Sequence, residues 1–192
     1  MEIPDKMTID AHDVPTELTR LEAAIFESLP GAQARAWRSR YWAALNPAAD
    51  FSLIWHRFAV WLLSSDDFGL PRIAGRAGRL ALFRVVDLHL RVINGDQPSP
   101  EEWFVGEAAA RSAAMSAEWP AASMASLAAM SSAAWMTVEW FAKDAVRSAA
   151  KAVARSATDS DGWLVVGSAS YLRMADRLIS LMSEAPVAAR TG

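Results

Sequence analysis

Histidine and aspartate are the residues of this chain whose chemistry could support acid–base catalysis or metal binding. The sequence contains three histidines, His12, His56 and His89. A histidine that meets a carboxylate in the folded chain can act as a general base or hold a metal ion. Asp66 and Asp87 are carboxylates that could converge with His56 and His89. One hypothesis is therefore a small helical enzyme or ligand-binding bundle that uses these four residues.

The spacing of these residues gives little support to such a site. Asp87 and His89 are two positions apart, which separates them by about 200° around a helix, so they cannot share a metal ion directly. His56 follows Trp55 in an apolar segment, where a hydrogen-bonded histidine at the margin of the core is the simpler interpretation. His12-Asp13 matches a phosphohydrolase dipeptide, but no earlier histidine completes that motif. We predict no metal site, no cofactor and no catalytic residue.

Arginines near an expected helix start form a candidate site for anions. Residues 75–79 read Gly-Arg-Ala-Gly-Arg, and backbone N–H groups at such a position can form an anion-binding nest. The segment lacks the Gly-Lys-Ser/Thr ending of a phosphate loop and follows no strand, so an ordinary loop and helix start is the alternative. The anion-binding candidates are Arg72, Arg76 and Arg79.

Composition restricts the class of protein. Of the 192 residues, 53% are hydrophobic and 21% are charged, and the formal net charge is -3. That hydrophobic fraction is too high for a disordered chain, and the lack of cysteine excludes disulfides and thiolate metal sites. We expect one domain over residues 1–185 and a flexible tail over residues 186–192. The acidic first residues are unlike an export signal, which favours a cytoplasmic location.

Apolar spacing and helix breakers predict an all-α protein, a single-domain bundle of about six to seven helices. Asp13 is the expected N-cap of the first helix, and Pro30-Gly31 and Asn46-Pro47 separate the next ones. Strand signals are almost absent. The expected helices cover about residues 14–29, 34–45, 47–64, 74–93, 99–119, 121–157 and 163–184.

The helix expected over residues 74–93 has an apolar face and a polar face. The spacing places five large apolar residues on one face, which we expect to be buried. Asn94-Gly95 ends this helix, with glycine in the left-handed conformation. The apolar face comprises Leu80, Phe83, Val86, Leu90 and Ile93, and the residues expected to face solvent are Arg76, Arg79, Arg84 and Asp87.

The start of the next helix has the clearest local signal in the chain. Ser99 is followed by Pro100 and, three positions after the serine, by Glu102. This is the pattern of a capping box, in which the serine and glutamate side chains satisfy each other's backbone N–H groups. Proline fits the first helical position, where its missing N–H has no cost.

Residues 107–157 are rich in alanine, with serine and methionine among the others. Alanine loses no side-chain entropy in a helix, so we expect a tight central helical hairpin whose halves meet at Pro120. The uncharged residues 119–138 have the length of a membrane span. They include too few large aliphatic residues to insert, so we predict a buried helix and no membrane span.

A family resemblance covers residues 92–153. Its elements are Val92-Ile93-Asn94-Gly95, the acidic helix start at Ser99-Glu102, and Ala-rich repeats at 107–114 and 145–153. In these elements the chain resembles the Ala-rich helical region of immunity proteins from bacterial polymorphic-toxin systems. It lacks the histidines that the family carries in these helices. The resemblance implies a small helical protein that binds and silences another protein.

Two further features point to a protein partner. Glu139, Lys143, Arg147, Lys151 and Arg155 follow one another at four-residue spacing, on one face of a helix. This ladder either supports its own helix or docks an acidic partner, and the net negative charge disfavours nucleic acid. Tryptophan, of which the chain has nine, is enriched at binding hot spots. The interaction candidates, whose tryptophans we expect to be exposed, are Trp37, Trp42, Trp119, Trp140, Lys143, Arg147, Lys151 and Arg155.

We therefore interpret the chain as a non-enzymatic protein–protein interaction module. Its most specific form is an immunity-type inhibitor that binds and neutralises a toxin. A phage or mobile-element inhibitor of a host defence complex would show the same sequence features, with a subunit of that complex as its partner. Self-association of the chain into a homodimer is a further alternative.

Overall fold

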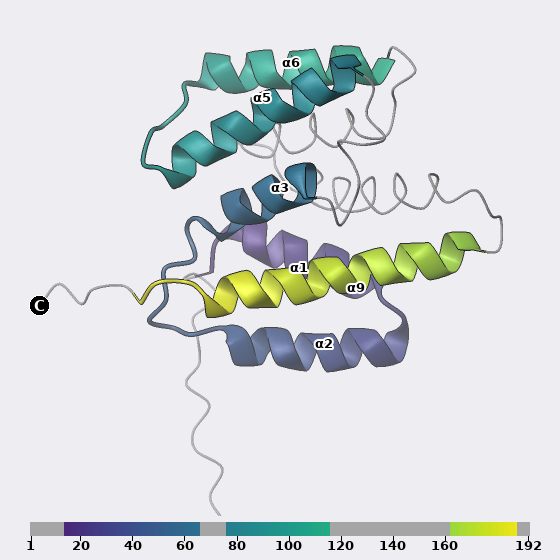
Figure 1. The fold of residues 1–192 in the computed structure, drawn as a ribbon. Coiled ribbons are helices and arrows are strands. Elements are labelled where there is room, and N and C mark those ends of the chain that lie inside the picture. Colours follow the sequence, from purple (N-terminus) through teal and green to yellow (C-terminus); the bar gives the residue numbers. More distant parts are fainter. Residues whose placement is uncertain (1–13, 66–75, 116–161, 188–192) are drawn as a thin grey trace, which may run out of the picture.

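The structure, a computed structural model, describes residues 14–65, 76–115 and 162–187. These ranges contain six helices and, apart from one isolated bridge, no β-structure. The all-α fold class is confirmed. The helices are α1 (Thr16–Ser28), α2 (Gly31–Ala44), α3 (Ile54–Ser64), α5 (Arg76–Ile93), α6 (Pro100–Met115) and α9 (Gly162–Ser183) (Figure 1).

Prolines precede the first two helices. Pro15 lies directly before α1 and Pro30 directly before α2, with φ angles of -51° and -59°. Proline is tolerated here because the first N–H groups of a helix have no partner within the helix. Asp13, the expected N-cap of the first helix, lies outside the described residues.

The third helix begins later than the sequence predicts. The prediction of helix from Pro47 is wrong up to Leu53, because two side chains hold this stretch in turns. The Asn46 side chain accepts a hydrogen bond from the N–H of Ala48, and Asp50 accepts one from Ser52. Such local bonds compete with helix formation.

The loop before α3 also binds the end of the described chain. The Asp50 N–H donates to the Pro186 carbonyl at 2.8 Å, and Ala49 forms an antiparallel bridge with Val187. Pro186 and Val187 belong to the segment that the sequence predicts to be a flexible tail. These two residues are attached to the domain by backbone contacts.

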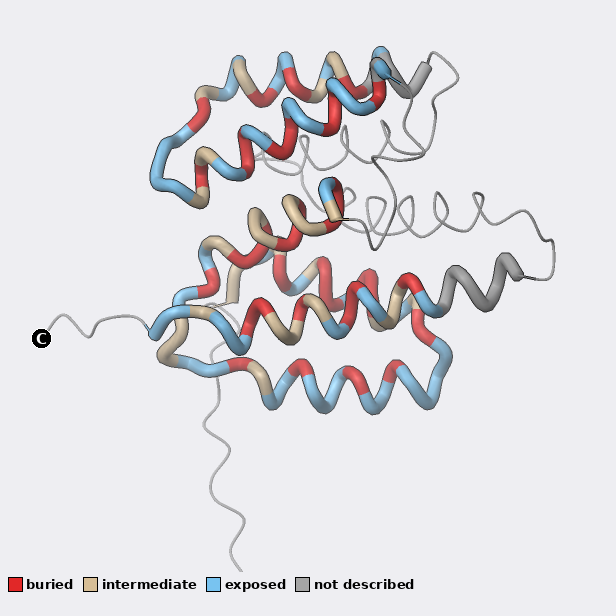
Figure 2. The backbone as a smooth tube through the Cα atoms, viewed as in Figure 1, coloured by how far each residue is buried: buried red, intermediate tan, exposed pale blue. Residues whose placement is uncertain are grey.

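Helix α3 lies between two layers of the fold. It packs against α1 and α9 on one side, where α2 completes the bundle, and against α5 on the other (Figures 1 and 2). Helices α5 and α6 pack against each other, and α3 is the main described helix that joins this pair to the rest. The core of the bundle includes Leu21, Ile25, Phe58, Leu62 and Leu178.

The α5–α6 connection folds as its sequence predicts. Gly95 has a φ of +86°, a conformation that favours glycine. The Ser99 N–H donates to the Glu102 carboxylate at 2.8 Å, and the Glu102 N–H donates to the Ser99 hydroxyl at 3.2 Å. The capping box is confirmed, and it fixes where α6 begins.

The buried face of α5 differs from the predicted one. Leu80, Phe83 and Leu90 are exposed, so their predicted place in the core is wrong, although Val86 is buried as expected. Helix α5 has apolar residues on two faces, and periodicity alone does not say which face packs. The prediction of exposure holds for Arg76, Arg79, Arg84 and Asp87. The residues that pack inward are Ala81, Leu82, Val85, Val86, Leu88, His89 and Val92.

Several predicted features fall outside the described residues. They include most of the Ala-rich hairpin, with its uncharged residues 119–138, and the charged ladder. None of the helices within the described ranges is both long and apolar enough to cross a membrane. The predicted site residues that lie outside are Asp66, Arg72, Trp119, Trp140, Lys143, Arg147, Lys151 and Arg155.

Candidate functional site

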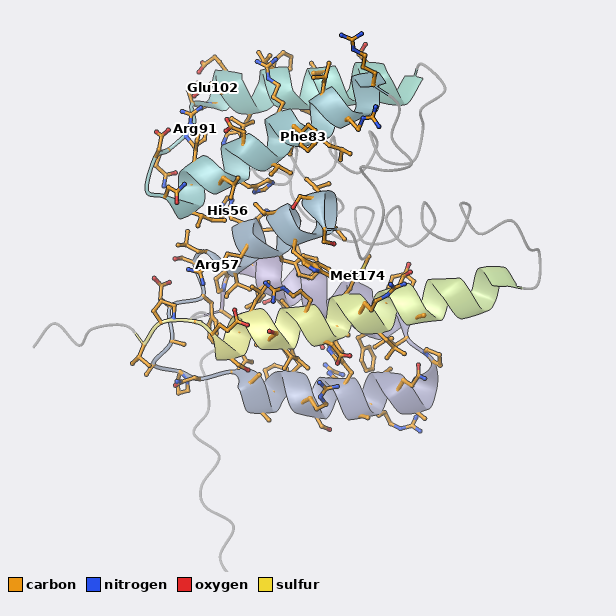
Figure 3. All side chains as sticks on the ribbon, viewed as in Figure 1. His56, Arg57, Phe83, Arg91, Glu102 and Met174 are labelled. Carbon is orange, nitrogen blue, oxygen red and sulfur yellow. The ribbon has the colours of Figure 1, made fainter. Side chains whose placement is uncertain are left out.

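The fold brings two of the three histidines together. His56 on α3 and His89 on α5 face each other, and their Nδ1 atoms lie 2.9 Å apart. At this distance one ring donates its proton and the other accepts it, so the two rings are opposite tautomers when both are neutral. The predicted hydrogen-bonded histidine at the margin of the core is thus confirmed for His56 (Figure 3).

Aromatic rings surround the histidine pair. The His89 ring lies edge to face with Trp103 of α6, at a centroid distance of 5.1 Å, and with Trp55 of α3 at 6.2 Å. His89 is completely buried, and its Nε2 has no hydrogen-bond partner among the described residues. The pair therefore lies at the point where α3, α5 and α6 meet.

Burial keeps both histidines neutral near pH 7. It lowers the pKa of His89 well below the usual 6.5, and the neighbouring His56 lowers it further. Burial also lowers the pKa of His56, against a smaller opposing effect of the Glu17 carboxylate. Loss of hydration penalises the charged imidazolium more than the neutral ring.

Of the two carboxylates in the hypothesised enzyme site, only Asp87 lies within the described residues. Asp87 is exposed on α5, away from His89. No group of three or more metal-ligating side chains occurs within the described ranges. A catalytic histidine must reach its substrate, whereas His89 is closed off by protein. The arrangement is suited to joining α3 to α5.

Of the two candidate tryptophans that the structure describes, one is exposed. Trp37 is only 2% exposed, and its indole N–H donates to the Ala175 carbonyl of α9 at 3.1 Å. Its predicted exposure is wrong, because α2 turns this face toward α9. Trp42 is 53% exposed and touches Tyr41 edge to face, so its predicted exposure is confirmed.

A larger exposed surface runs along α5. Leu80 is 65% exposed, Phe83 54% and Leu90 40%. By helical spacing, exposed charged residues lie between and beside them on the same side of the helix. We call this surface the α5 outer face. It comprises Arg76, Arg79, Leu80, Phe83, Arg84, Asp87 and Leu90.

Three arginines of the α5 outer face, Arg76, Arg79 and Arg84, form no ion pair with another described residue. Four other described arginines, Arg38, Arg40, Arg91 and Arg177, do form ion pairs. Arg40 lies 2.9 Å from Asp176, and Arg91 binds both Asp96 and Glu102 at the α5–α6 turn (Figure 3). The α5 outer face therefore combines apolar surface with three arginines that form no ion pair within the described part of the chain. Two of the anion-binding candidates, Arg76 and Arg79, belong to it.

Comparisons with known protein families, with curated proteins and with solved structures found no match for this chain.

Proposed function

We propose that this chain is a non-enzymatic protein–protein interaction module that binds its partner through the α5 outer face. One observation carries the proposal: three large apolar side chains stand exposed in a line on one helix, among arginines that have no described acidic partner. Apolar patches rimmed by polar residues mark binding sites on soluble proteins. Arginine is also enriched at binding hot spots.

The free energy of burial supports this proposal. Covering one leucine or phenylalanine side chain stabilises a protein or complex by about 1.5–3 kcal/mol. Single exposed apolar residues are common and need no explanation. Leu80, Phe83 and Leu90 are different, because one partner element can cover all three at once.

The more specific form of the proposal is an immunity-type inhibitor that neutralises a toxin. Its support is the resemblance of residues 92–153 to immunity proteins. Binding alone is sufficient for such an inhibitor, which needs no catalytic group of its own. A phage-encoded inhibitor of a defence complex would bind a different kind of partner, so the identity of the bound protein separates the two.

Capture from the native host tests the interaction. Leu80→Asp and Phe83→Asp should abolish the recovery of a stoichiometric partner, as measured by quantitative mass spectrometry. Phe104→Asp is the matched control, because Phe104 is also an exposed phenylalanine but lies on α6. Circular dichroism establishes that all variants are folded. Equal recovery with wild type and both variants would contradict the proposed function.

Toxicity then tests the inhibitory role. The captured protein should arrest growth when it is expressed alone, and co-expression of the wild-type chain should restore growth. Phe83→Asp should fail to restore it, while Phe104→Asp should succeed. A partner that is bound but is harmless would leave the interaction module in place and exclude the toxin inhibitor.

A further inference from the structure

The exposed residues of α5 follow the spacing of a coiled-coil seam. Leu80, Phe83, Asp87 and Leu90 are separated by three, four and three residues, which is the alternation of a and d positions in a heptad. Leu80 and Asp87 take the a positions, and Phe83 and Leu90 take the d positions. These residues span about 15 Å along the helix, enough to contact about three turns of a second helix.

Arginines flank this seam on both sides. Arg79 precedes Leu80 and takes the g position, and Arg84 follows Phe83 and takes the e position. In coiled coils the e and g residues form ion pairs across the interface and decide which helix is accepted. Both positions are exposed here, so they are available to acidic residues of another helix.

The same charges disfavour a second copy of this chain as the occupant. In a parallel pair of α5 helices, Arg79 of one copy would face Arg84 of the other. In an antiparallel pair each arginine would face its own equivalent. Like charges at e and g positions disfavour both arrangements.

The position of Asp87 favours a protein partner over an anionic surface. Its carboxylate is exposed in the middle of the seam, between Phe83 and Leu90. A phosphate-rich surface, whether lipid or nucleic acid, would repel this central charge. A partner helix can instead place a lysine or arginine opposite it, and a polar residue at one a position then sets the register.

Resting on the proposed function, we infer that the partner segment is an acidic amphipathic α-helix, with apolar residues at its a and d positions and glutamate or aspartate at e and g. It carries one basic residue opposite Asp87. It lies along α5 and covers Leu80, Phe83 and Leu90. The positive charges of Arg79 and Arg84 favour this acidic helix over one with basic residues at e and g.

Designed peptides test this inference on the full chain. The acidic probe has three heptads with leucine at a and d, glutamate at e and g, and lysine at the central a position. The basic probe differs only in having lysine at e and g. Fluorescence anisotropy measures the binding of each probe to wild type, to Arg79→Glu/Arg84→Glu, and to Arg35→Glu. The last is a control because Arg35 is exposed on α2.

The acidic probe should bind wild type and Arg35→Glu equally and bind the double variant at least about tenfold more weakly. The basic probe should show the opposite preference. An acidic probe that binds all three proteins equally, or none of them, would overturn the inference. The inference would also be overturned if the chain bound phosphatidylserine vesicles in place of the peptide and this binding depended on Arg79 and Arg84.

These outcomes can be separated from a failure of the proposed function. If the probes show no charge preference while capture of the cellular partner still depends on Leu80 and Phe83, only the acidic helix is excluded. If capture does not depend on Leu80 and Phe83, the proposed interaction module itself is wrong.

A further comparison tests the register of the partner helix. Glutamate in place of the central lysine of the acidic probe should weaken its binding to wild type, and Asp87→Lys should restore that binding.

Discussion

The Nδ1 atoms of His56 and His89 are 2.9 Å apart, and this hydrogen bond joins α3 to α5. It spans the boundary between the bundle and the α5–α6 pair. Two neutral rings can form this hydrogen bond, because one Nδ1 donates and the other accepts. Two imidazolium rings cannot form it, because both Nδ1 atoms then carry a proton and neither can accept.

We expect the domain to lose stability as the pH falls below about 6.5. The folded state lowers the pKa of both histidines from 6.5, so the unfolded chain binds more protons in this range. The histidine contribution is therefore complete above pH 6.5 and is lost as the pH falls toward the folded-state pKa values. Its slope is about 1.4 kcal/mol per pH unit for each proton.

Urea denaturation between pH 5 and pH 8 measures this dependence. The double variant His56→Phe/His89→Leu should have a flatter profile than wild type. Carboxylates such as Glu22, whose pKa burial raises, affect both proteins alike and cancel in the difference. Parallel profiles would show that the two histidines do not titrate as their burial requires.

Ser99→Ala should destabilise the domain by about 1 kcal/mol, because the serine hydroxyl caps the Glu102 N–H at the start of α6. Ser39→Ala is the control, since the Ser39 hydroxyl bonds an α2 carbonyl at an exposed position. We expect the control to change the free energy of unfolding by less than about 0.5 kcal/mol. Equal effects in urea titrations would mean that the cap contributes nothing specific.

Gly106→Val should destabilise the α5–α6 pair. A Cβ atom at Gly106 would lie 3.0 Å from Leu88 Cδ1 and 3.8 Å from Val85 Cγ2, so a larger side chain overpacks this contact, at a cost of about 1–3 kcal/mol. Ala108→Val, at an exposed position of the same helix, controls for the lower helix propensity of valine. Thermal unfolding should show a clearly lower Tm for Gly106→Val alone.

The two described tryptophans of α2 should respond differently to the same substitution. Trp37→Phe removes a buried hydrogen bond to Ala175 and leaves a space in the core, so we expect a loss of about 1–3 kcal/mol. Trp42→Phe should have little effect, because this side chain is half exposed. A larger loss at Trp42 in urea denaturation would contradict the assigned orientation of α2.

Local signals in the sequence predicted local structure well. The capping box at Ser99 and Glu102 was recognisable because its residues are three positions apart and act on each other. The start of α3 was predicted too early, because turn formation by Asn46 and Asp50 competed with an apolar pattern. That competition depends on hydrogen bonds that composition does not reveal.

The candidate sites required tertiary structure. Thirty-three positions separate His56 from His89, and no spacing rule predicts their contact. On α5 the apolar spacing predicts that Leu80, Phe83 and Leu90 are buried, but a second face, with Val85 and His89, packs inward instead. Two apolar faces on one helix are themselves a signal that one of them is available for a partner.

The attachment of the α5–α6 pair mainly through α3, among the described helices, has a consequence for local unfolding. A unit held by one interface can open as a whole while the rest stays folded, and hydrogen exchange reports the free energy of that opening. We expect the amides of α5 and α6 to exchange together and faster than those of α1 and α9. A ligand on the α5 outer face should then slow exchange across both helices of the pair, including α6, which the ligand does not touch.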